Sequence, residues 1–292
     1  MTTALNTPQI TKLEALLRLL DDDSPMVREA VARELQGFGG DVGHYIYSKH
    51  IALSHLEWDI LRRILFDTYQ QELRENFPKW DHAESDMERL ESALGMLARF
   101  QNGPQYRPDL TELLDGLSEE YDAFVDTPDH ASLAQFLFVE KQIRCMEAAD
   151  EDADASNLSY VIEQRVGLPI SLVCLYMLLG HRHGLAISGC NWPGSFYARF
   201  RKGDKLYVVD CGAGGLVFEA DELLRLQGPS RDAAEAVLTV DIDVATLVRR
   251  TLSNLAFAYR REGETECSLL MLDLLRSLEQ SNRHGYHNSA AQ

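Results

Sequence analysis

Cysteine is the side chain of this sequence best suited to attack a carbonyl carbon, because its thiolate is a strong nucleophile near neutral pH. The chain contains five cysteines, at Cys145, Cys174, Cys190, Cys211 and Cys267. An odd number of scattered cysteines without a C-x-x-C pair predicts neither a zinc ribbon nor a disulfide framework. We therefore expect reduced thiols packed in the core, unless one of them proves reactive.

Two of these thiols lie in surroundings that disfavour the thiolate. Cys174 belongs to the almost wholly apolar segment 171–183, where burial raises the pKa of a thiol. Cys211 directly follows Asp210, whose carboxylate opposes a second negative charge. The residue types therefore predict inert thiols at both positions.

Histidines and glycines could instead bind a metal or a phosphate. His181 and His183 are two residues apart, so on a helix they point to different sides and cannot share a metal. Gly212, Gly214 and Gly215 follow a predicted strand, but no Lys-Ser/Thr pair or helix signal completes a P-loop. We expect a tight turn with positive φ there, and no metal or cofactor site.

The spacing of apolar residues changes along the segments around these residues, from a helical to a strand-like pattern. Residues 171–183 predict a helix that is buried on most sides. Three β-like runs follow, at residues 186–190, 196–200 and 205–210, with a turn at 201–204. A buried helix followed by a strand meander is typical of an α+β unit with a helix on an antiparallel sheet.

Helical patterns flank this unit on both sides. Apolar residues three and four apart predict a helix pair within residues 11–38, with Ser24 as N-cap and Pro25 in the first turn. Further helical patterns cover residues 51–77, 84–100, 110–147 and 244–279, the last with a turn at 262–264. The acidic stretch 150–157 predicts a solvated loop that ends in the N-cap candidates Ser156 and Asn157.

Composition narrows the classes of partner. The chain has 46 acidic and 28 basic residues, a formal net charge of −18, which opposes binding to nucleic acid. This excess either serves ordinary solubility or matches a basic protein surface. Neither a signal peptide nor an apolar run of membrane-spanning length is recognisable. We expect a cytoplasmic protein without a membrane partner; the sequence leaves its oligomeric state open.

Three segments in order resemble the bacterial Sir-B-type transglutaminase-like family: NLSYVIEQRVGLPISLVCLY at 157–176, GCNWPGSFYARF at 189–200 and VVDCGAGG at 208–215. Residues 16–39 resemble a HEAT-type repeat, and residues 249–275 resemble a tetratricopeptide repeat. The resemblance implies a mostly helical α+β fold: a transglutaminase-like, papain-like core with a small antiparallel sheet, flanked by helical repeat-like segments. The expected domains are 1–85 (HEAT-like), 88–228 (core) and 229–292 (tetratricopeptide-like hairpin and tail).

The resemblance also implies where catalytic residues would lie. In the superfamily a Cys at a helix N-terminus attacks an amide, a His on a neighbouring strand carries the proton, and an Asp orients the His. The matching positions hold Ser171 instead of the Cys and Ser195 instead of the His, and only Asp210 is retained. A serine hydroxyl without a positioned base is a poor nucleophile, so we expect no catalytic residues among these vestigial positions.

Two functions follow from this reasoning. The first is a non-catalytic regulatory or protein-interaction protein built on a degenerate core, in which Asn191, Trp192 and Pro193 border a cleft for a protein or peptide partner. Trp192 either lines this cleft or fills the core. The alternative is a cysteine or serine amide hydrolase or transglutaminase-like enzyme with an atypical nucleophile.

Overall fold

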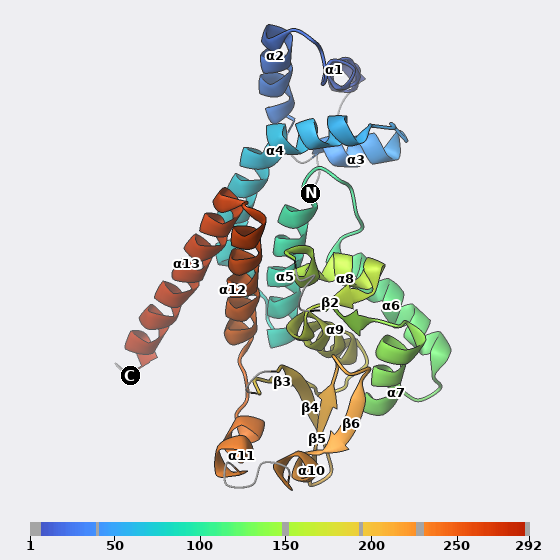
Figure 1. Cartoon of the computed structure of the whole chain (residues 1–292), viewed down its shortest axis with the longest axis vertical. Coiled ribbons are helices and arrows are strands. Elements are labelled where there is room, and N and C mark those ends of the chain that lie inside the picture. Colours follow the sequence, from blue (N-terminus) through green and yellow to red (C-terminus); the bar gives the residue numbers. More distant parts are fainter. Residues whose placement is uncertain (1–6, 39–40, 148–151, 193–194, 226–230, 290–292) are drawn as a thin grey trace. The chain divides into compact units, whose positions relative to one another are not determined.

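The computed structural model describes residues 7–38, 41–147, 152–192, 195–225 and 231–289 (Figure 1). Helices predominate and the strands are few, which confirms the predicted mostly helical α+β class. The chain forms two compact units. One contains Met1–Asn76 and Arg99–Pro108, and the other contains Phe77–Ala98 and Asp109–Gln292.

The first unit is helical throughout its described part. Its helices are α1 (Thr7–Leu17), α2 (Pro25–Gln36), α3 (Asp41–Ser48), α4 (His55–Asn76) and the last residues of α5 (Asp86–Asn102). Ser24 is the N-cap of α2, as predicted, but its hydroxyl makes no capping bond; its N–H donates to the Asp22 carboxylate at 2.8 Å. Leucines spaced along α1, α2 and α4 are buried, which explains why their periodicity predicted this unit. The sequence did not predict α3.

Helix α9 (Pro169–Arg182) is the central element of the second unit. Every residue from Ile170 to Gly180 is buried, as the apolar pattern predicted. Helices packed against it include α6 (Leu110–Phe124), α7 (His130–Gln135), α8 (Leu158–Gln164) and α12 (Val244–Glu262). The other short helices are η1 (Phe77–His82), η2 (Phe136–Glu140, a π-helix), η3 (Asp154–Ser156), α10 (Ala220–Arg225) and α11 (Arg231–Thr239).

The sheet of this unit lies on α9. Its antiparallel order is β3 (Ser188–Cys190), β4 (Tyr197–Lys202), β5 (Lys205–Asp210) and β6 (Leu216–Glu219), and α9 packs against β3 and β4 (Figure 1). Lys202 pairs with Lys205 across a two-residue turn in which Gly203 has φ +60°. Three strands agree with the predicted runs. Strand β6 and a short parallel pair, β1 (Arg144–Cys145) with β2 (Val166–Gly167), were not predicted.

The acidic stretch is where the prediction was wrong. Residues 148–151 lie outside the described residues, but from Ala153 to Asn157 the chain contains η3, and four of its five residues are buried: Ala153, Ala155, Ser156 and Asn157. Ala153 N–H donates to the Glu262 carboxylate at 2.7 Å. The two alanines are small enough to be buried, and the Glu262 carboxylate accepts the backbone N–H of Ala153. For this reason the acidic composition of the stretch did not predict that it is buried. Asn157 caps α8, as predicted.

The chain ends in a helical hairpin. Helices α12 and α13 (Thr265–Ser289) pack side by side and are joined where predicted, at Gly263, whose φ of +84° suits glycine (Figure 1). Asp243 caps α12 by accepting the Thr246 N–H at 2.7 Å. Within the described residues, no helix has the length and hydropathy needed to cross a membrane.

Candidate functional site: a pocket beside the N-terminus of helix α9

The start of α9 lies where the sequence predicted it. Leu168 is extended and Pro169 stands in the first turn. Ser171 is only 4% exposed, and its hydroxyl donates to the Ala155 carbonyl at 2.9 Å. The same carbonyl accepts the Leu168 N–H at 3.0 Å. The Ser171 hydroxyl therefore ties η3 to α9 and is not presented to a substrate.

The other two predicted positions also make local contacts. Ser195 N–H donates to the Trp192 carbonyl at 3.0 Å. The Asp210 carboxylate accepts the Ala213 N–H at 3.0 Å, and its backbone carbonyl accepts the Gly215 N–H at 2.9 Å. In the described part of the chain, no hydrogen bond links Ser171, Ser195 and Asp210 to one another. Asp210 shapes the glycine turn after β5.

Burial makes the thiols poor nucleophiles. It raises the pKa of Cys174 to about 12. Burial, and then the Asp210 carboxylate, raise the pKa of Cys211 well above its usual range. Cys190 and Cys267 are buried as well, and burial is the main cause of their raised pKa values. Cys145 is half-buried. The predicted core packing is thus confirmed for four of the five cysteines.

The imidazoles near the core have partners of their own. His183 Nε2 lies 3.0 Å from Ser118 Oγ, and its Nδ1 lies 3.4 Å from the Asp122 carboxylate. The His130 ring stacks on Phe200, and burial lowers its pKa. Among the side chains that the structure describes, no imidazole is hydrogen-bonded to the Ser171 hydroxyl or to one of the four buried cysteines, and no cluster of His, Cys, Asp and Glu has the form of a metal site.

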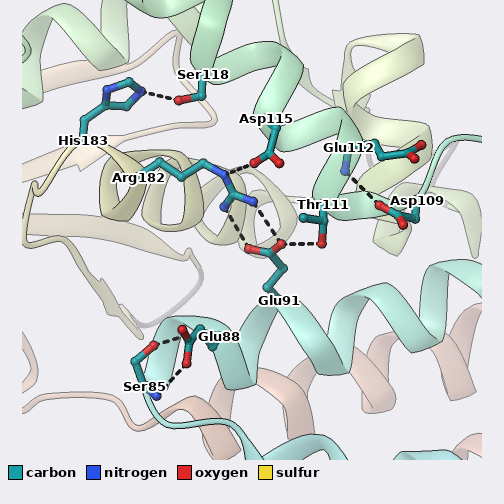
Figure 2. Close-up of polar contacts among 10 residues, drawn as sticks. All are labelled: Ser85, Glu88, Glu91, Asp109, Thr111, Glu112, Asp115, Ser118, Arg182 and His183. Atoms are coloured by element: carbon teal, nitrogen blue, oxygen red, sulfur yellow. Dashed lines mark hydrogen bonds and ion pairs between the residues drawn. The ribbon is translucent and has the colours of Figure 1, made fainter. Parts of the chain in front are cut away.

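An ion-pair network holds the far end of α9. Figure 2 shows the Arg182 guanidinium between two carboxylates: it donates to both Glu91 oxygens at 2.8 and 3.0 Å, and to Asp115 at 2.9 Å. Thr111 Oγ1 donates to Glu91 at 2.7 Å. Burial opposes the charge of Arg182, but the bonds to Glu91 and Asp115 outweigh it and raise the pKa of Arg182. The network connects α9 with α5 and α6.

A pocket of about 510 Å³ opens beside the N-terminus of α9. Three parts of the chain line it, together with Asp152: the start of α9 (Leu168, Pro169 and Ile170), the segment around β3 and β4 (Asn191, Trp192, Ser195 and Phe196), and helix α12 (Arg250, Asn254, Phe257, Ala258 and Arg261). The predicted cleft residues Asn191 and Trp192 are therefore in the pocket wall, whereas Pro193 lies outside the described residues. Trp192 also packs against the cluster around Cys190, so it satisfies both expectations for it.

Two guanidinium groups give this pocket its charge. Arg250 donates to the Asn191 side-chain oxygen, and its guanidinium lies 5.2 Å from the centre of the Phe196 ring. Arg261 lies 6.0 Å from the centre of the Phe257 ring. The Asp152 carboxylate accepts the Ala155 N–H at 3.0 Å. Within the described residues neither arginine lies in an ion pair, and the wall contains two guanidinium groups and one carboxylate, that of Asp152.

Sequence reasoning did not identify the α12 side of this pocket. Arg250, Asn254, Phe257 and Arg261 are spaced by four, three and four residues, which places them on one face of the helix. The sequence pattern that could have indicated it is the large aromatic residue Phe257 on the same helical face as two arginines. Such a pattern is typical of an exposed binding surface on a helix.

Comparison with known proteins identifies the family of the central part of the chain. A model of the transglutaminase-like superfamily matches residues 104–253. A UPF0162 protein of Xylella fastidiosa strain Temecula1 is 32% identical over 118 residues, and one of Pseudomonas aeruginosa is 31% identical over 115. Each alignment covers 38% of this chain and 42% of the relative, less than half of either. No solved structure matches the chain significantly. Because the family model covers just over half of the sequence, the chain belongs to the transglutaminase-like superfamily.

Proposed function

We propose that this chain is a non-catalytic regulatory or protein-interaction protein that keeps the transglutaminase-like core as a scaffold. The observation that carries the proposal is the position of Ser171. This residue stands where the resemblance puts the nucleophile, yet its hydroxyl is buried and donates to the Ala155 carbonyl. A hydroxyl in such a bond, without an imidazole beside it, cannot be activated for attack on an amide.

The replacement of the base supports the same conclusion. Ser195 occupies the position that the resemblance assigns to histidine, and a hydroxyl does not accept a proton at neutral pH. Loss of both nucleophile and base removes several orders of magnitude in rate, because these groups act as a unit. What remains useful is the shape of the core and its pocket.

The flanking segments support a role in binding another protein. The proposed arrangement is a HEAT-like segment at 1–85, a Sir-B-type core at 88–228 and a tetratricopeptide-like hairpin with tail at 229–292; such repeats usually present surfaces to other proteins. The net charge of −18 disfavours nucleic acid and favours a partner with basic segments. We place this interaction in the bacterial cytoplasm.

A turnover assay separates the proposal from an amide hydrolase or transglutaminase with an atypical nucleophile. The purified chain is incubated with a glutamine-containing peptide and an amine acceptor, and release of ammonia and of cleaved peptide is followed, beside the Ser171→Ala variant. We expect both proteins to match the buffer blank. Turnover that disappears in Ser171→Ala, or in one Cys→Ala variant, would establish the enzyme instead.

A second experiment tests the binding role directly. A photo-reactive phenylalanine analogue replaces Phe257, which is 63% exposed at the pocket, or Leu269 on α13 as an exposed control. We expect a protein partner to be cross-linked in the host cell from position 257 and not from position 269. If neither position, nor a scan of the other exposed sites of the chain, captures a protein, the interaction role is wrong.

A further inference from the structure

Helix α12 presents two different faces. Leu252, Leu255 and Tyr259 are buried on one face, inside the helical packing of the unit. The opposite face carries Arg250, Asn254, Phe257 and Arg261, all in the pocket wall. Phe257 remains 63% exposed although it lies in the pocket wall. A ligand in the pocket would cover its ring.

The two arginines on this face differ from two less exposed arginines of the same unit. Arg182 and Arg199 each form an ion pair, with Glu91 and Asp241 respectively. Arg250 and Arg261 have no carboxylate partner in the described part of the chain, although the sequence has 46 acidic residues to supply one. The pocket's own carboxylate, Asp152, accepts the Ala155 N–H and supplies one negative charge against the two guanidinium groups. The described wall of the pocket therefore has one positive charge in excess, which a single carboxylate of a ligand can balance.

Planar guanidinium groups match the two oxygens of a carboxylate, and they bind it most strongly where aromatic walls exclude water. Trp192 and Phe196 supply such walls, and a ligand in the pocket would also cover the exposed Phe257 ring. The pocket volume of about 510 Å³ is that of a typical small-ligand site. These features together suit a carboxylate that carries an apolar side chain next to it.

We propose that this pocket binds the free C-terminus of a peptide, with the terminal carboxylate on the face of α12 that carries Arg250 and Arg261 and an apolar last side chain against Phe257 and Trp192. The inference rests on the proposed function and names the part of the partner that the pocket recognises. A terminal carboxylate fits better than acidic side chains, because a protein of net charge −18 repels an acidic segment but accepts a neutral or basic one that ends in a single carboxylate.

The test compares two peptides that differ in one group. The first peptide is N-terminally fluorescein-labelled Lys-Ala-Leu-Phe with a free C-terminal carboxylate. The second is the same labelled peptide with a C-terminal amide. Fluorescence anisotropy with the full chain is expected to show at least tenfold tighter binding of the free acid. A third peptide, Lys-Glu-Leu-Phe amide, carries the charge on a side chain and is expected to bind no better than the first amide.

Matched variants assign the effect to the pocket. Arg250→Gln with Arg261→Gln should remove the preference for the free acid, and Arg261→Gln alone, at an exposed position, should reduce it severalfold without affecting folding. Arg260→Gln, its exposed neighbour on α12, should leave the preference unchanged.

Each contrary result has a distinct meaning. Equal binding of acid and amide would overturn the carboxylate site while leaving the proposed interaction role in place. Equal binding of the free acid and the glutamate peptide, or displacement of the free acid by millimolar inorganic phosphate, would show a general anion site and would also overturn it. If no peptide binds but position 257 still cross-links a protein in the cell, this inference fails alone; if cross-linking fails too, both proposals are wrong.

Discussion

Gly214 and Gly215 lie side by side in the turn after β5, with φ of +75° and +74°. They differ in the space around them. A Cβ on Gly215 would lie 2.6 Å from Phe138 Cδ2 and 3.2 Å from the Ala134 carbonyl, whereas a Cβ on Gly214 would have no neighbour within 4 Å. The pair therefore separates the cost of a positive φ from the cost of a close approach.

We expect Gly214→Ala to lower the free energy of unfolding by about 1 kcal/mol, the cost of positive φ for alanine. Gly215→Ala should lower it by roughly 2–4 kcal/mol, because crowding against Phe138 adds to the same cost. Urea unfolding followed by circular dichroism measures both. Equal losses would show that the turn moves away from Phe138 without penalty.

Asp129 makes the stability of the fold depend on pH in the acidic range. It caps α7, where its carboxylate accepts the Ser132 N–H at 2.8 Å, and this bond lowers the pKa of Asp129 below its ordinary value of 3.8. A lowered folded-state pKa stabilises the protein above the ordinary value, and that stability is lost as pH falls below it.

When the pH falls from about 4 to about 2.5, the Asp129→Asn variant should therefore lose less free energy of unfolding than the native chain. Asparagine, like aspartate, can cap the N-terminus of α7, so the variant keeps the helix cap. Thermal unfolding across this range measures the difference. Asp126→Asn, at an exposed position nearby, serves as the control for removal of one negative charge from this segment. A parallel profile for Asp129→Asn would contradict the assignment.

Predictions for single residues were correct where the residue determines the conformation of the backbone next to it. Asn157 as a helix cap and the glycines after Asp210 as a tight turn both follow from the conformations that these residues favour. The hydroxyl bond from Ser171 to Ala155 could not be foreseen, because it joins residues sixteen positions apart through a segment whose acidic composition suggested solvent.

At the scale of elements, an ion-pair network connects α9 with α5 and adds to the packing that attaches α9 to α6. The Arg182 and Glu91 side chains are 16% and 18% exposed, whereas Asp115 is 61% exposed. Loss of a carboxylate beside a half-buried guanidinium is costly, since it leaves the charge without compensation. Loss of an exposed partner costs little, because water screens it.

Glu91→Gln should accordingly lower the free energy of unfolding by about 2–3 kcal/mol, and Asp115→Asn by less than about 1 kcal/mol. Chemical denaturation of the two single variants gives the comparison. Should Asp115→Asn cost as much as Glu91→Gln, the two carboxylates would share the charge equally and the difference in exposure would not matter.

The predictable elements were those with a sustained period. The leucine spacing of α4, the unbroken apolar run of α9 and the hairpin around Gly263 are each readable in the sequence. Strand β6 has four residues, and β1 and β2 have two each, so too few positions alternate to give a signal. Their existence depends on neighbours that pair with them from elsewhere in the chain.

For the whole molecule, net charge is the dominant electrostatic property. A formal charge of −18 means that negative groups repel one another across the surface, and dissolved salt weakens this repulsion. We expect the melting temperature to rise by several degrees between about 10 mM and 500 mM sodium chloride. A fall over that range would mean that attractive ion pairs, such as Arg182 with Glu91, outweigh the repulsion.

The composition gives the net charge of the chain, but it does not show where the charged side chains lie in the fold. Arg250 and Arg261 lie 59 and 70 residues beyond Asn191 in the sequence, and only the fold brings them into one pocket. The sequence located the start of α9 and the Asn191–Trp192 side through the family resemblance. The three domains that it predicted stay a prediction.

Helix α12 also determines where the chain can be cut for expression. The family match stops at residue 253, in the middle of this helix. A recombinant fragment trimmed to that limit would retain Arg250 but lack Phe257 and Arg261, and it would lose the Gly263 stop together with all of α13. Such a fragment would therefore be a misleading reagent for ligand screening, and cloning boundaries should enclose the whole hairpin.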